Sequence, residues 1–468
     1  MPEGSVLHSV DFVAPTTVRY SSLPIIVQNP DDKEGPDLRS FTHNGVVNES
    51  FRCYSFAPMG PQRATVFDRC FDTLLPAGSI QSSVFNLCSA TLGAGALSLP
   101  MAFRESGLVL CFVMLLIAAL STVFSIWLLI DIYERTGIRT YEESTESLAG
   151  RPMRGVVEVL TILFCYGTAV AYIIAVGDTM KPIEDLSEHI TKTMTMIVFW
   201  ALFMLPTSCL REVNSLRFTS FIGVLVMVYL TVAVGSDTIT ELVVRPNDIH
   251  PVKPFNVEFT AILSMPVVLF AYTCQVNVFA IYDELQERRP RKMLKVGGYA
   301  MLLCLSIYSI VGMLGYTRFG DETKGDILTN YDFKSSPILI KGTFITMGVA
   351  ITTAFPLNVF PLRTSLNLMV FGVPQLQSNV AHLTETLLIV VSMLLAAIYI
   401  PGIDIVFSLL GSTASSLLCF IFPAYLAYCA GTHRTSRAVC VGMVLLALLG
   451  LFIGILGTWC TISERILK

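Results

Sequence analysis

The chain contains 468 residues, of which 53% are hydrophobic and only 14% are charged, and its mean hydropathy is +0.66. A soluble globular protein of this length does not carry so large an apolar fraction, so the composition excludes that class and predicts an all-α polytopic membrane protein. The formal net charge of −4 points to no particular partner, and we expect membrane lipid rather than nucleic acid around the chain.

Residues 1–78 form a polar segment with scattered Pro, Ser, Asp and Gly and without sustained hydrophobic periodicity. Such a composition predicts a largely disordered tail, which we place in the cytosol. The first 20 residues lack the apolar core of a cleaved signal peptide. We therefore divide the chain into this tail, a transmembrane domain at 79–460 and a short external end at 461–468.

Eleven apolar stretches follow the tail, and each approaches the length of about 20 residues that a membrane-crossing helix needs. They cover residues 79–101, 107–132, 155–178, 194–210, 216–236, 258–282, 295–316, 338–360, 382–400, 404–428 and 438–460. Basic residues gather in the short loops that follow the even-numbered spans, with the densest run at 287–295, so we expect these loops in the cytosol. An odd number of spans then places the carboxyl end on the external or lumenal side.

The first span contains the sequence Gly93-Ala94-Gly95-Ala96, followed by Pro100. Glycine weakens a helix by about 1 kcal/mol and proline removes an amide donor, so this pattern favours a helix that is broken here. Lipid cannot satisfy the freed backbone groups, and the break must therefore lie against protein or a water-filled cavity. Free amides at the start of the second half-helix would bind a carboxylate through hydrogen bonds and the helix dipole. The alternative is a Gly/Ala surface for close helix packing.

The sixth span is the second unusual one, because Pro266 is followed by a polar centre that includes Tyr272, Thr273, Gln275 and Asn277. This pattern suggests another interruption, five spans after the first. Such spacing is typical of two five-helix halves that form an inverted repeat with paired broken helices at mid-membrane. Alternatively, the proline is a plain kink and the polar side chains bond neighbouring helices.

Five separated segments carry a family resemblance, and they occur in the order SVFNLCSATLGAGALSLPMAF, LPTSCLREVNSLRFTSFIGV, TCQVNVFAIYDEL, GDILTNYDF and FPLRTSL. These segments resemble, in turn, the first span, the fourth-to-fifth junction, the sixth span, an outer loop and the eighth-span exit of the amino acid/auxin permease family, within the amino acid–polyamine–organocation superfamily. The likeness extends from about residue 79 to 460 and is nearest in character to amino acid permeases of protists and fungi.

The resemblance implies secondary active uptake of amino acids by a five-plus-five inverted repeat, with helices one and six broken and an eleventh helix added. A bundle of spans one, two, six and seven would rock against a scaffold to give alternating access. The substrate α-carboxylate would be held by the backbone of the first break, at Gly93, Ala94, Gly95 and Ala96. The amino group and side chain of the substrate would face the sixth span, at Phe270, Ala271, Tyr272 and Thr273.

The third span offers two aromatic side chains and one acidic side chain. Tyr166 and Tyr172 could each contribute a hydroxyl to the carboxylate or simply pack between helices, and we add Tyr166 to the predicted site. A proton carrier needs a titratable group within the membrane, and Glu158 is our choice because a third-span residue can face the first span. Glu158 could instead pair with a cationic substrate, snorkel to the interface or pair with Arg154 four residues earlier.

Sodium-coupled members of the family resemble this chain at 84–87, but they carry an asparagine two residues further on, where this chain has Ser89. The loss of an amide oxygen removes one ligand for a hard cation, although a hydroxyl and backbone carbonyls still bind sodium. Thr352 and Thr353 could complete a cation site or could bond their own helix. We therefore expect a co-transported proton, with sodium as the alternative.

A membrane enzyme or a metal carrier would need His, Asp, Glu or Cys side chains that converge within the membrane, and the sequence shows no such cluster. A Walker-type phosphate loop is also absent from the sequence, so we expect no enzyme, no metal, no cofactor and no ATP-driven transport. An amino acid-sensing receptor that signals through the tail is the alternative from another class. Neutral substrates and cationic ones such as arginine or lysine both remain open. We expect the plasma membrane as the address, with the vacuolar or lysosomal membrane second.

Overall fold

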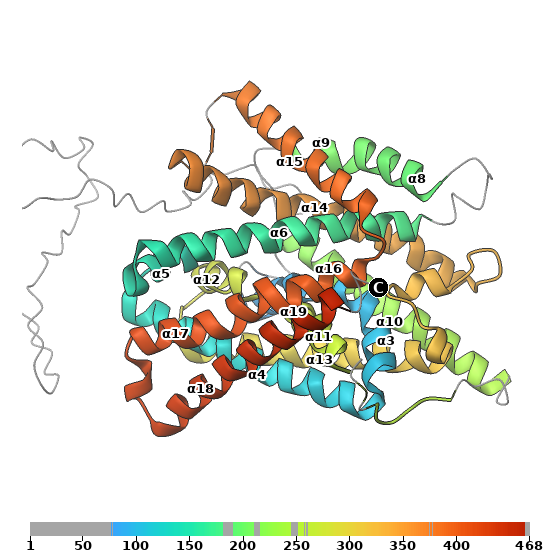
Figure 1. Ribbon diagram of the computed structural model, residues 1–468, viewed down its shortest axis with the longest axis horizontal. Coiled ribbons are helices and arrows are strands. Elements are labelled where there is room, and N and C mark those ends of the chain that lie inside the picture. The colour runs from blue at the N-terminus through green and yellow to red at the C-terminus, as the bar shows by residue number, and fades with distance from the viewer. Residues whose placement is uncertain are drawn as a thin grey trace, which may run out of the picture. The chain divides into compact units, whose positions relative to one another are not determined.

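The computed structural model describes residues 76, 78–180, 191–209, 216–244, 251–256, 258, 261–373, 375–376 and 378–463, and for 216–219 it describes the backbone alone. The predicted tail, apart from residues 76 and 78, and residues 464–468 of the predicted external end lie outside this range. The division of the chain into tail, transmembrane domain and external end therefore stays a prediction. All regular structure within the described ranges is helical (Figure 1).

Helices are the expected outcome for this sequence, because an apolar segment in lipid must pair its backbone amides and carbonyls within itself. The larger helices are α2 (Ile80–Thr91), α3 (Gly95–Ser106), α4 (Leu108–Thr136), α5 (Tyr141–Ala149), α6 (Arg151–Thr179), α8 (Lys192–Phe199), α10 (Leu216–Val244), α11 (Ala261–Ala271), α12 (Gln275–Glu284), α13 (Pro290–Phe319), α14 (Ile338–Phe371), α15 (Asn379–Tyr399), α16 (Ile403–Leu410), α17 (Phe422–Cys429) and α18 (Arg437–Phe452). Shorter helical turns are η1 (Trp200–Met204), α9 (Leu205–Ser208), η3 (Gly320–Glu322), η4 (Ile327–Asn330), η5 (Gly411–Ser415), η6 (Leu417–Ile421), η7 (Thr432–Arg434), η8 (Ile453–Gly457) and α19 (Thr458–Thr461).

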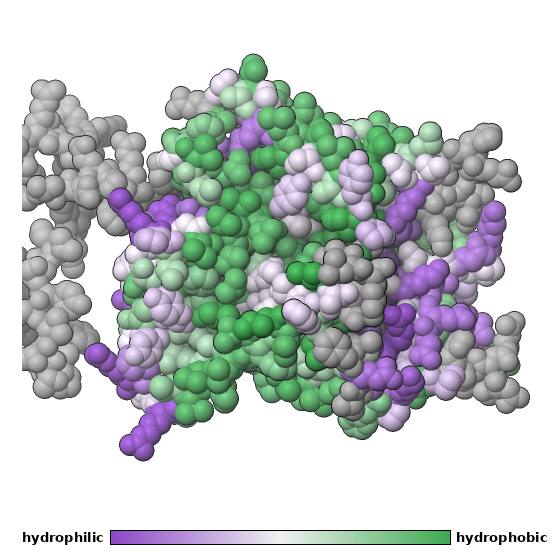
Figure 2. Space-filling model, in the orientation of Figure 1, coloured by the Kyte–Doolittle hydropathy of each residue, from purple (hydrophilic) through white to green (hydrophobic). Residues whose placement is uncertain are grey.

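The predicted spans correspond to these helices. Among the described residues, nine spans are long and apolar enough to cross a membrane, and the bent pair of α2 and α3 adds a tenth. The fourth predicted span, 194–210, is shorter, and there α8, η1 and α9 follow one another without a gap from Lys192 to Ser208. Figure 2 shows that hydrophobic side chains cover the middle of the visible surface, between more polar ends.

The first predicted break is present. α2 ends at Thr91, α3 begins at Gly95, and the two helix axes differ in direction by 61°. Pro100 lies in the second turn of α3, beyond the first four amides, so it removes one hydrogen bond of the helix without ending it.

The second predicted break is also present, but it is milder. α11 ends at Ala271 and α12 begins at Gln275, while Pro266 lies inside α11. The segment from Ala261 to Glu284 still reads as one apolar span, since its two halves are not bent like α2 and α3. A polar centre without glycine thus interrupts the helical hydrogen bonds without bending the span as sharply as the first one is bent.

The two broken spans lie at the centre of the helix packing. α3 packs against α11 and α13, and α2 packs against α10 and α13. α6 runs beside α14 and also contacts α16 (Figure 1). Buried side chains of these helices form one continuous hydrophobic core, to which Leu97, Phe103 and Tyr308 belong.

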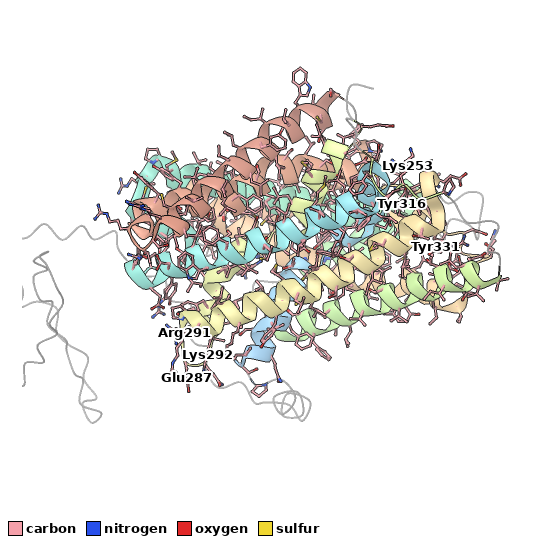
Figure 3. All side chains as sticks on the ribbon, turned by 90° about the horizontal axis from the view of Figure 1, so that it is seen from below. Lys253, Glu287, Arg291, Lys292, Tyr316 and Tyr331 are labelled. Carbon is pink, nitrogen blue, oxygen red and sulfur yellow. The ribbon has the colours of Figure 1, made fainter. Side chains whose placement is uncertain are left out.

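The helix α13 connects two ends of this helical unit. Arg291 and Lys292 lie at its start, whereas Tyr316 lies near its other end beside Lys253 (Figure 3). We call the end at the start of α13 the basic end, and it comprises residues 131–154, 283–292 and 432–437. Contacts such as the 3.0 Å ion pair of Arg288 with Asp283 join these segments. We call the second the loop end, and it comprises residues 251–256, 316–338 and 400–404.

Candidate site at the two helix breaks

The first break leaves two adjacent backbone amides without an acceptor among the described residues. Within the break, the amide of Leu92 donates to the last turn of α2 and that of Gly93 donates to the carbonyl oxygen of Thr91, 3.0 Å away. The amides of Ala94 and Gly95 make no such bond, because α3 begins here and the first amides of a helix have no helical partner. They lie at the positive end of the α3 dipole, which is an arrangement that binds anions.

Side chains of α6 and α11 close on this break at both glycines. A Cβ atom on Gly93 would lie 3.1 Å from the Tyr172 hydroxyl oxygen. A Cβ atom on Gly95 would lie 3.4 Å from the ring of Phe270 and 3.5 Å from the Cα atom of Ala271. The glycines therefore allow the third and sixth spans to approach the backbone of the first. The Tyr172 hydroxyl therefore lies beside the residue that precedes the two free amides.

The second break, by contrast, pairs its own amides. The amide of Tyr272 donates to the Leu269 carbonyl oxygen at 3.2 Å, and that of Thr273 donates to the Phe270 carbonyl oxygen at 3.0 Å. The Gln275 side chain accepts from the Cys274 amide through Oε1, at 2.9 Å. This break therefore presents side chains and the carbonyl end of α11 to its surroundings, rather than free amides.

Tyr308 of α13 connects the two breaks. Its hydroxyl oxygen lies 2.7 Å from the carbonyl oxygen of Thr91, at the end of α2, and 2.8 Å from that of Ala271, at the end of α11. The side chain is fully buried, and its ring meets that of Tyr272 edge-on with centroids 5.4 Å apart. Nothing in the local sequence around Tyr308 indicated this role.

The structure brings the two predicted groups of binding residues together. Gly95 lies against Phe270 and Ala271, and the Phe270 ring stacks on Phe407 at 4.4 Å and approaches Phe164 at 5.8 Å. These rings form an apolar wall beside the free amides. The substrate roles of the predicted residues Gly93, Ala94, Gly95, Ala96, Phe270, Ala271, Tyr272 and Thr273 stay predictions.

The two tyrosines of α6 have different neighbours. Tyr166 donates its hydroxyl to Ser392 of α15 at 3.2 Å, whereas the Tyr172 hydroxyl lies at Gly93 and within hydrogen-bonding range of the Asn358 side chain. The rotation of α6 thus presents Tyr172, rather than Tyr166, to the first break. Sequence analysis considered both residues and selected Tyr166, because a single sequence does not reveal this rotation.

Both ends of the unit are closed over the breaks. At the loop end, α3 packs against η4 and Arg104 donates to the carbonyl oxygen of Thr323. At the basic end, Tyr133 donates to Asp283 at 2.9 Å and Tyr282 donates to Glu134. Ala96 and Tyr272 are no more than 1% exposed, whereas Gly93 in the first break is half-buried.

Glu158 is buried near the basic end and forms an ion pair with Arg154, whose Nε lies 2.7 Å from the carboxylate. The same guanidinium binds Glu146 of α5 at 2.6 Å, which lowers the pKa of Glu146. Burial raises the pKa of Glu142, also on α5, and the nearby charge of Glu158 raises it further. Sequence analysis missed Glu142, because an acidic residue in the first turn of a helix is ordinarily explained by the helix dipole.

The three candidate cation ligands have separate surroundings. Ser89 of α2 lies against α10, with its hydroxyl oxygen 3.2 Å from the place of a Cβ atom on Gly223. Thr352 donates to the Gly348 carbonyl oxygen at 2.6 Å, and Thr353 donates within α14 as well while its side chain is exposed. Both threonines thus make the bonds to their own helix that sequence analysis named as the alternative.

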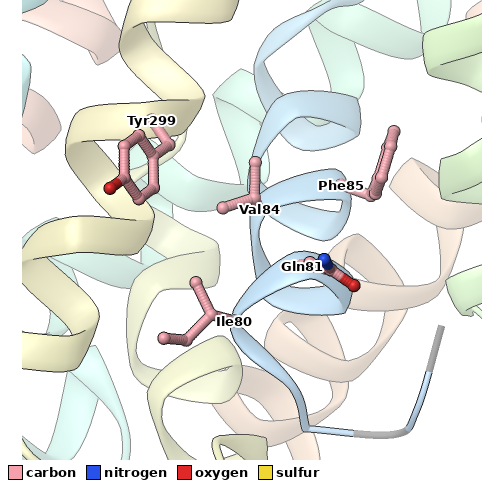
Figure 4. A pocket seen from close by; sticks show the side chains of 5 residues that line it. All are labelled: Ile80, Gln81, Val84, Phe85 and Tyr299. Carbon is pink, nitrogen blue, oxygen red and sulfur yellow. The ribbon is translucent and has the colours of Figure 1, made fainter.

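A groove of ≈ 450 Å³ lies between α2 and α13, on the part of α2 that precedes the break (Figure 4). Ile80, Gln81, Val84, Phe85 and Tyr299 line it. Four of the five side chains present mainly carbon to the groove, so it is suited to a lipid chain and not to a charged solute. It is separate from the free amides of the first break.

Comparison with known proteins connects this geometry with transport. The family model described as "Transmembrane amino acid transporter protein" matches residues 76–463. "Amino acid transporter AVT6E" of Arabidopsis thaliana is 29% identical over 415 residues, which cover 82% of this chain and 84% of that protein. "Sodium-coupled neutral amino acid transporter 7" of Xenopus laevis is 27% identical, with 74% and 79% covered. "Vacuolar amino acid transporter 5" of Schizosaccharomyces pombe is 28% identical, with 74% and 83% covered.

Two solved structures share the fold. A manganese transporter of Eremococcus coleocola superposes with a TM-score of 0.56 at 11% identity, over 82% of this chain and 88% of that one. A Na⁺-coupled sialic acid symporter superposes with a TM-score of 0.52 at 13% identity, over 86% and 93%. At such identities the likeness concerns the fold alone, and it confirms the predicted polytopic, all-helical transporter architecture.

Proposed function

The chain belongs to the transmembrane amino acid transporter family, and from this premise we propose that it is a proton-coupled permease that moves amino acids into the cytosol by alternating access. Membership places it among transporters rather than enzymes. Its relatives are named for amino acid transport, but they differ in the ion and in the membrane that their names give. The ion, the substrate and the membrane are therefore part of the proposal.

The pair of free amides at Ala94 and Gly95 carries the proposal. Two donors at the start of α3 suit an α-carboxylate, which a buried and otherwise apolar site must neutralise by hydrogen bonds. The carbonyl end of α11, at Phe270 and Ala271, lies opposite and carries the negative end of a helix dipole. These two oxygens already accept from the Thr273 amide and the Tyr308 hydroxyl, and the second lone pair of each suits an α-ammonium group. The zwitterionic part common to amino acids thus has a complement on each broken helix.

The coupling proton binds at the basic end in this proposal. Glu142 and Glu158 approach one another beside a single guanidinium, that of Arg154, which also serves Glu146. Burial and the nearby charge of Glu158 both raise the pKa of Glu142, so Glu142 binds a proton at a higher pH than an isolated carboxylate would. The raised pKa of Glu142 supports this assignment alongside Glu158.

Selectivity and address complete the proposal. The wall of Phe164, Phe270 and Phe407 favours substrates with apolar or long aliphatic side chains, so neutral and cationic amino acids both remain candidates. We retain the plasma membrane as one candidate location. The relatives named as vacuolar support the vacuolar membrane as the second candidate. In both cases the substrate moves into the cytosol, with the predicted tail and the basic end on that side.

The deciding experiment is uptake of a labelled amino acid panel into proteoliposomes, with an imposed pH gradient and with sodium present or absent. Accumulation driven by the pH gradient alone is the expected result, and accumulation that needs sodium would contradict proton coupling. Binding without accumulation would favour an amino acid-sensing receptor.

The proton site is tested with Glu158→Gln and Glu142→Gln in the same vesicles. Each variant removes a proton-binding carboxyl group, so we expect uptake that depends much less on pH, or an altered response to cationic substrates for Glu158→Gln. Glu143→Gln is the matched control on the same turn of α5, and its pH profile should equal that of the unaltered protein. Unchanged pH profiles and substrate ranges in both test variants would remove this cluster from the mechanism.

A further inference from the structure

The carbonyl ends of the two broken helices meet at a single hydroxyl group. Thr91 is the last residue of α2 and Ala271 is the last residue of α11. The last carbonyls of a helix lack amide partners within the helix and carry the negative end of its dipole. The Thr91 oxygen accepts from the Gly93 amide at 3.0 Å, which leaves it one further lone pair. Two such ends in a buried place require a positive or hydrogen-donating partner. Tyr308, at 2.7 and 2.8 Å from the two oxygens, is that partner.

The distances describe hydrogen bonding rather than a set of cation ligands. Oxygen ligands of a hard cation lie about 2.3–2.6 Å from the ion, so neighbouring ligands at right angles lie about 3.3–3.7 Å apart. The Tyr308 oxygen approaches both carbonyl oxygens more closely than this. A hydroxyl has one proton to donate, so at any instant one carbonyl accepts it or both share it.

Converging half-helix ends and unwound carbonyls are the groups that coordinate a coupling sodium ion in transporters built from inverted repeats. We propose that the Tyr308 hydroxyl replaces such an ion between α2 and α11, and that Tyr308 is thereby the residue that makes this permease independent of sodium. This inference deepens the function proposed above and rests on it. Tyr308 is a specificity-determining residue for the ion, and it touches the helix ends rather than the substrate.

The replacement has a physical consequence for the transport cycle. A sodium ion would leave with the substrate and would have to bind again from outside, whereas a tyrosine hydroxyl stays with α13. The two helix ends therefore remain joined through an uncharged group in every state, and the driving proton must bind elsewhere. The cluster of Glu142, Glu158 and Arg154 is the place that the proposed function gives to this proton.

Tyr308→Ser and Tyr308→Asn test the inference, because each removes the ring and leaves room for a cation beside the Thr91 and Ala271 carbonyls. In proteoliposomes with a fixed pH gradient, we expect 100 mM sodium to stimulate uptake by these variants at least about 5-fold relative to choline, since uncompensated carbonyls bind a hard cation. Sodium should also raise their melting temperature in detergent, which reports ion binding independently of transport. The unaltered protein should respond in neither assay.

Tyr316→Phe is the matched control. Tyr316 is equally buried on the same helix, but its hydroxyl accepts from the Lys253 amide at the loop end (Figure 3). Removing that hydroxyl should create no response to sodium. A sodium response in this control would show that loosening α13 is sufficient, and it would overturn the assignment to Tyr308.

The possible failures are distinguishable. If the unaltered protein does not accumulate amino acids under a pH gradient, the proposed function fails. If it does, but the folded Ser and Asn variants show no sodium response, the inference about Tyr308 alone is overturned. If both variants fail to fold, Tyr308→Phe is the deciding variant, because its ring still fills the space that a cation would need. Its uptake should fall at least about 5-fold, and sodium should not restore it. Uptake equal to that of the unaltered protein would contradict the inference.

Discussion

The two breaks solve the same problem in opposite ways. At the first, glycines flank Ala94, the chain bends by 61°, and the amides of Ala94 and Gly95 have no acceptor among the described residues. At the second, no glycine is present, the span is less sharply bent, and the Gln275 side chain accepts from the Cys274 amide. The first break leaves two amide donors unpaired, whereas the amides of the second break are paired within the break.

The difference supports the proposal that the first break binds the carboxylate and that the second shapes the pocket. A buried amide without a partner costs about 1–3 kcal/mol, so a native structure retains a pair of them where something else supplies the acceptor for part of the time. The second break has no such donors to offer near Tyr272 and Thr273. It contributes aromatic walls and a carbonyl end instead. We expect the two breaks to respond differently to substitution.

The largest effect is expected from filling the first break. Gly93→Val would place a branched side chain against the Tyr172 hydroxyl, and Gly95→Val would place one against Phe270 and Ala271. Both variants should reduce amino acid uptake below about 1% of the unaltered rate, because the substrate carboxylate can no longer reach the amides. Uptake into proteoliposomes, normalised to inserted protein, is the measurement.

Gly298→Val on α13 is the control for this prediction. It is also a helical glycine, but a Cβ atom there meets no atom within 4 Å, so the cost is limited to helix propensity. Normal uptake by both folded break variants would sink the carboxylate assignment.

A smaller effect is expected from the hydroxyl beside the first break. Tyr172→Phe removes one donor to the bound carboxylate in the proposed site. A hydrogen bond to a charged group contributes about 1.5–3 kcal/mol, which corresponds to a rise in KM of about 10- to 160-fold. The maximal rate should change little. Tyr166→Phe is the counterpart, since it loses only a bond to Ser392, and its KM should stay within about 2-fold. A larger rise in KM for Tyr166→Phe than for Tyr172→Phe would indicate that Tyr166, rather than Tyr172, contacts the carboxylate.

The smallest effect is expected at the second break. Gln275→Leu removes the acceptor of the Cys274 amide without touching the amides of the first break. The unsatisfied amide should lower the free energy of unfolding by about 1–3 kcal/mol and slow transport by about 5-fold, with KM for the amino acid nearly unchanged. Thermal melting in detergent, combined with uptake kinetics, would detect this. A large rise in KM instead would mean that the second break binds the carboxylate too.

Local sequence features predicted the architecture well. Apolar stretches of membrane-spanning length identified the helices, and the pattern from Gly93 to Pro100 located the first break to within a few residues. The polar centre around Tyr272 located the second break. These features are predictable because hydropathy, glycine flexibility and proline geometry act on the few residues around them.

Other features depend on contacts between distant segments. Tyr308 lies 217 residues from Thr91, and its bond to that carbonyl follows from how α13 packs against α2 and α11. The same holds for the choice between Tyr166 and Tyr172, which differ only in the direction that α6 presents to its neighbours.

The sequence by itself therefore determined the class of protein, the positions of the spans and the places where two of them break, because each depends on short-range chemistry. Only the tertiary structure decided which side chains meet at the breaks, that Arg154 holds both Glu146 and Glu158, and that a tyrosine joins the two helix ends. The physical reason is helix rotation: an apolar helix in lipid has no polar face to reveal its orientation, so packing against its neighbours sets it.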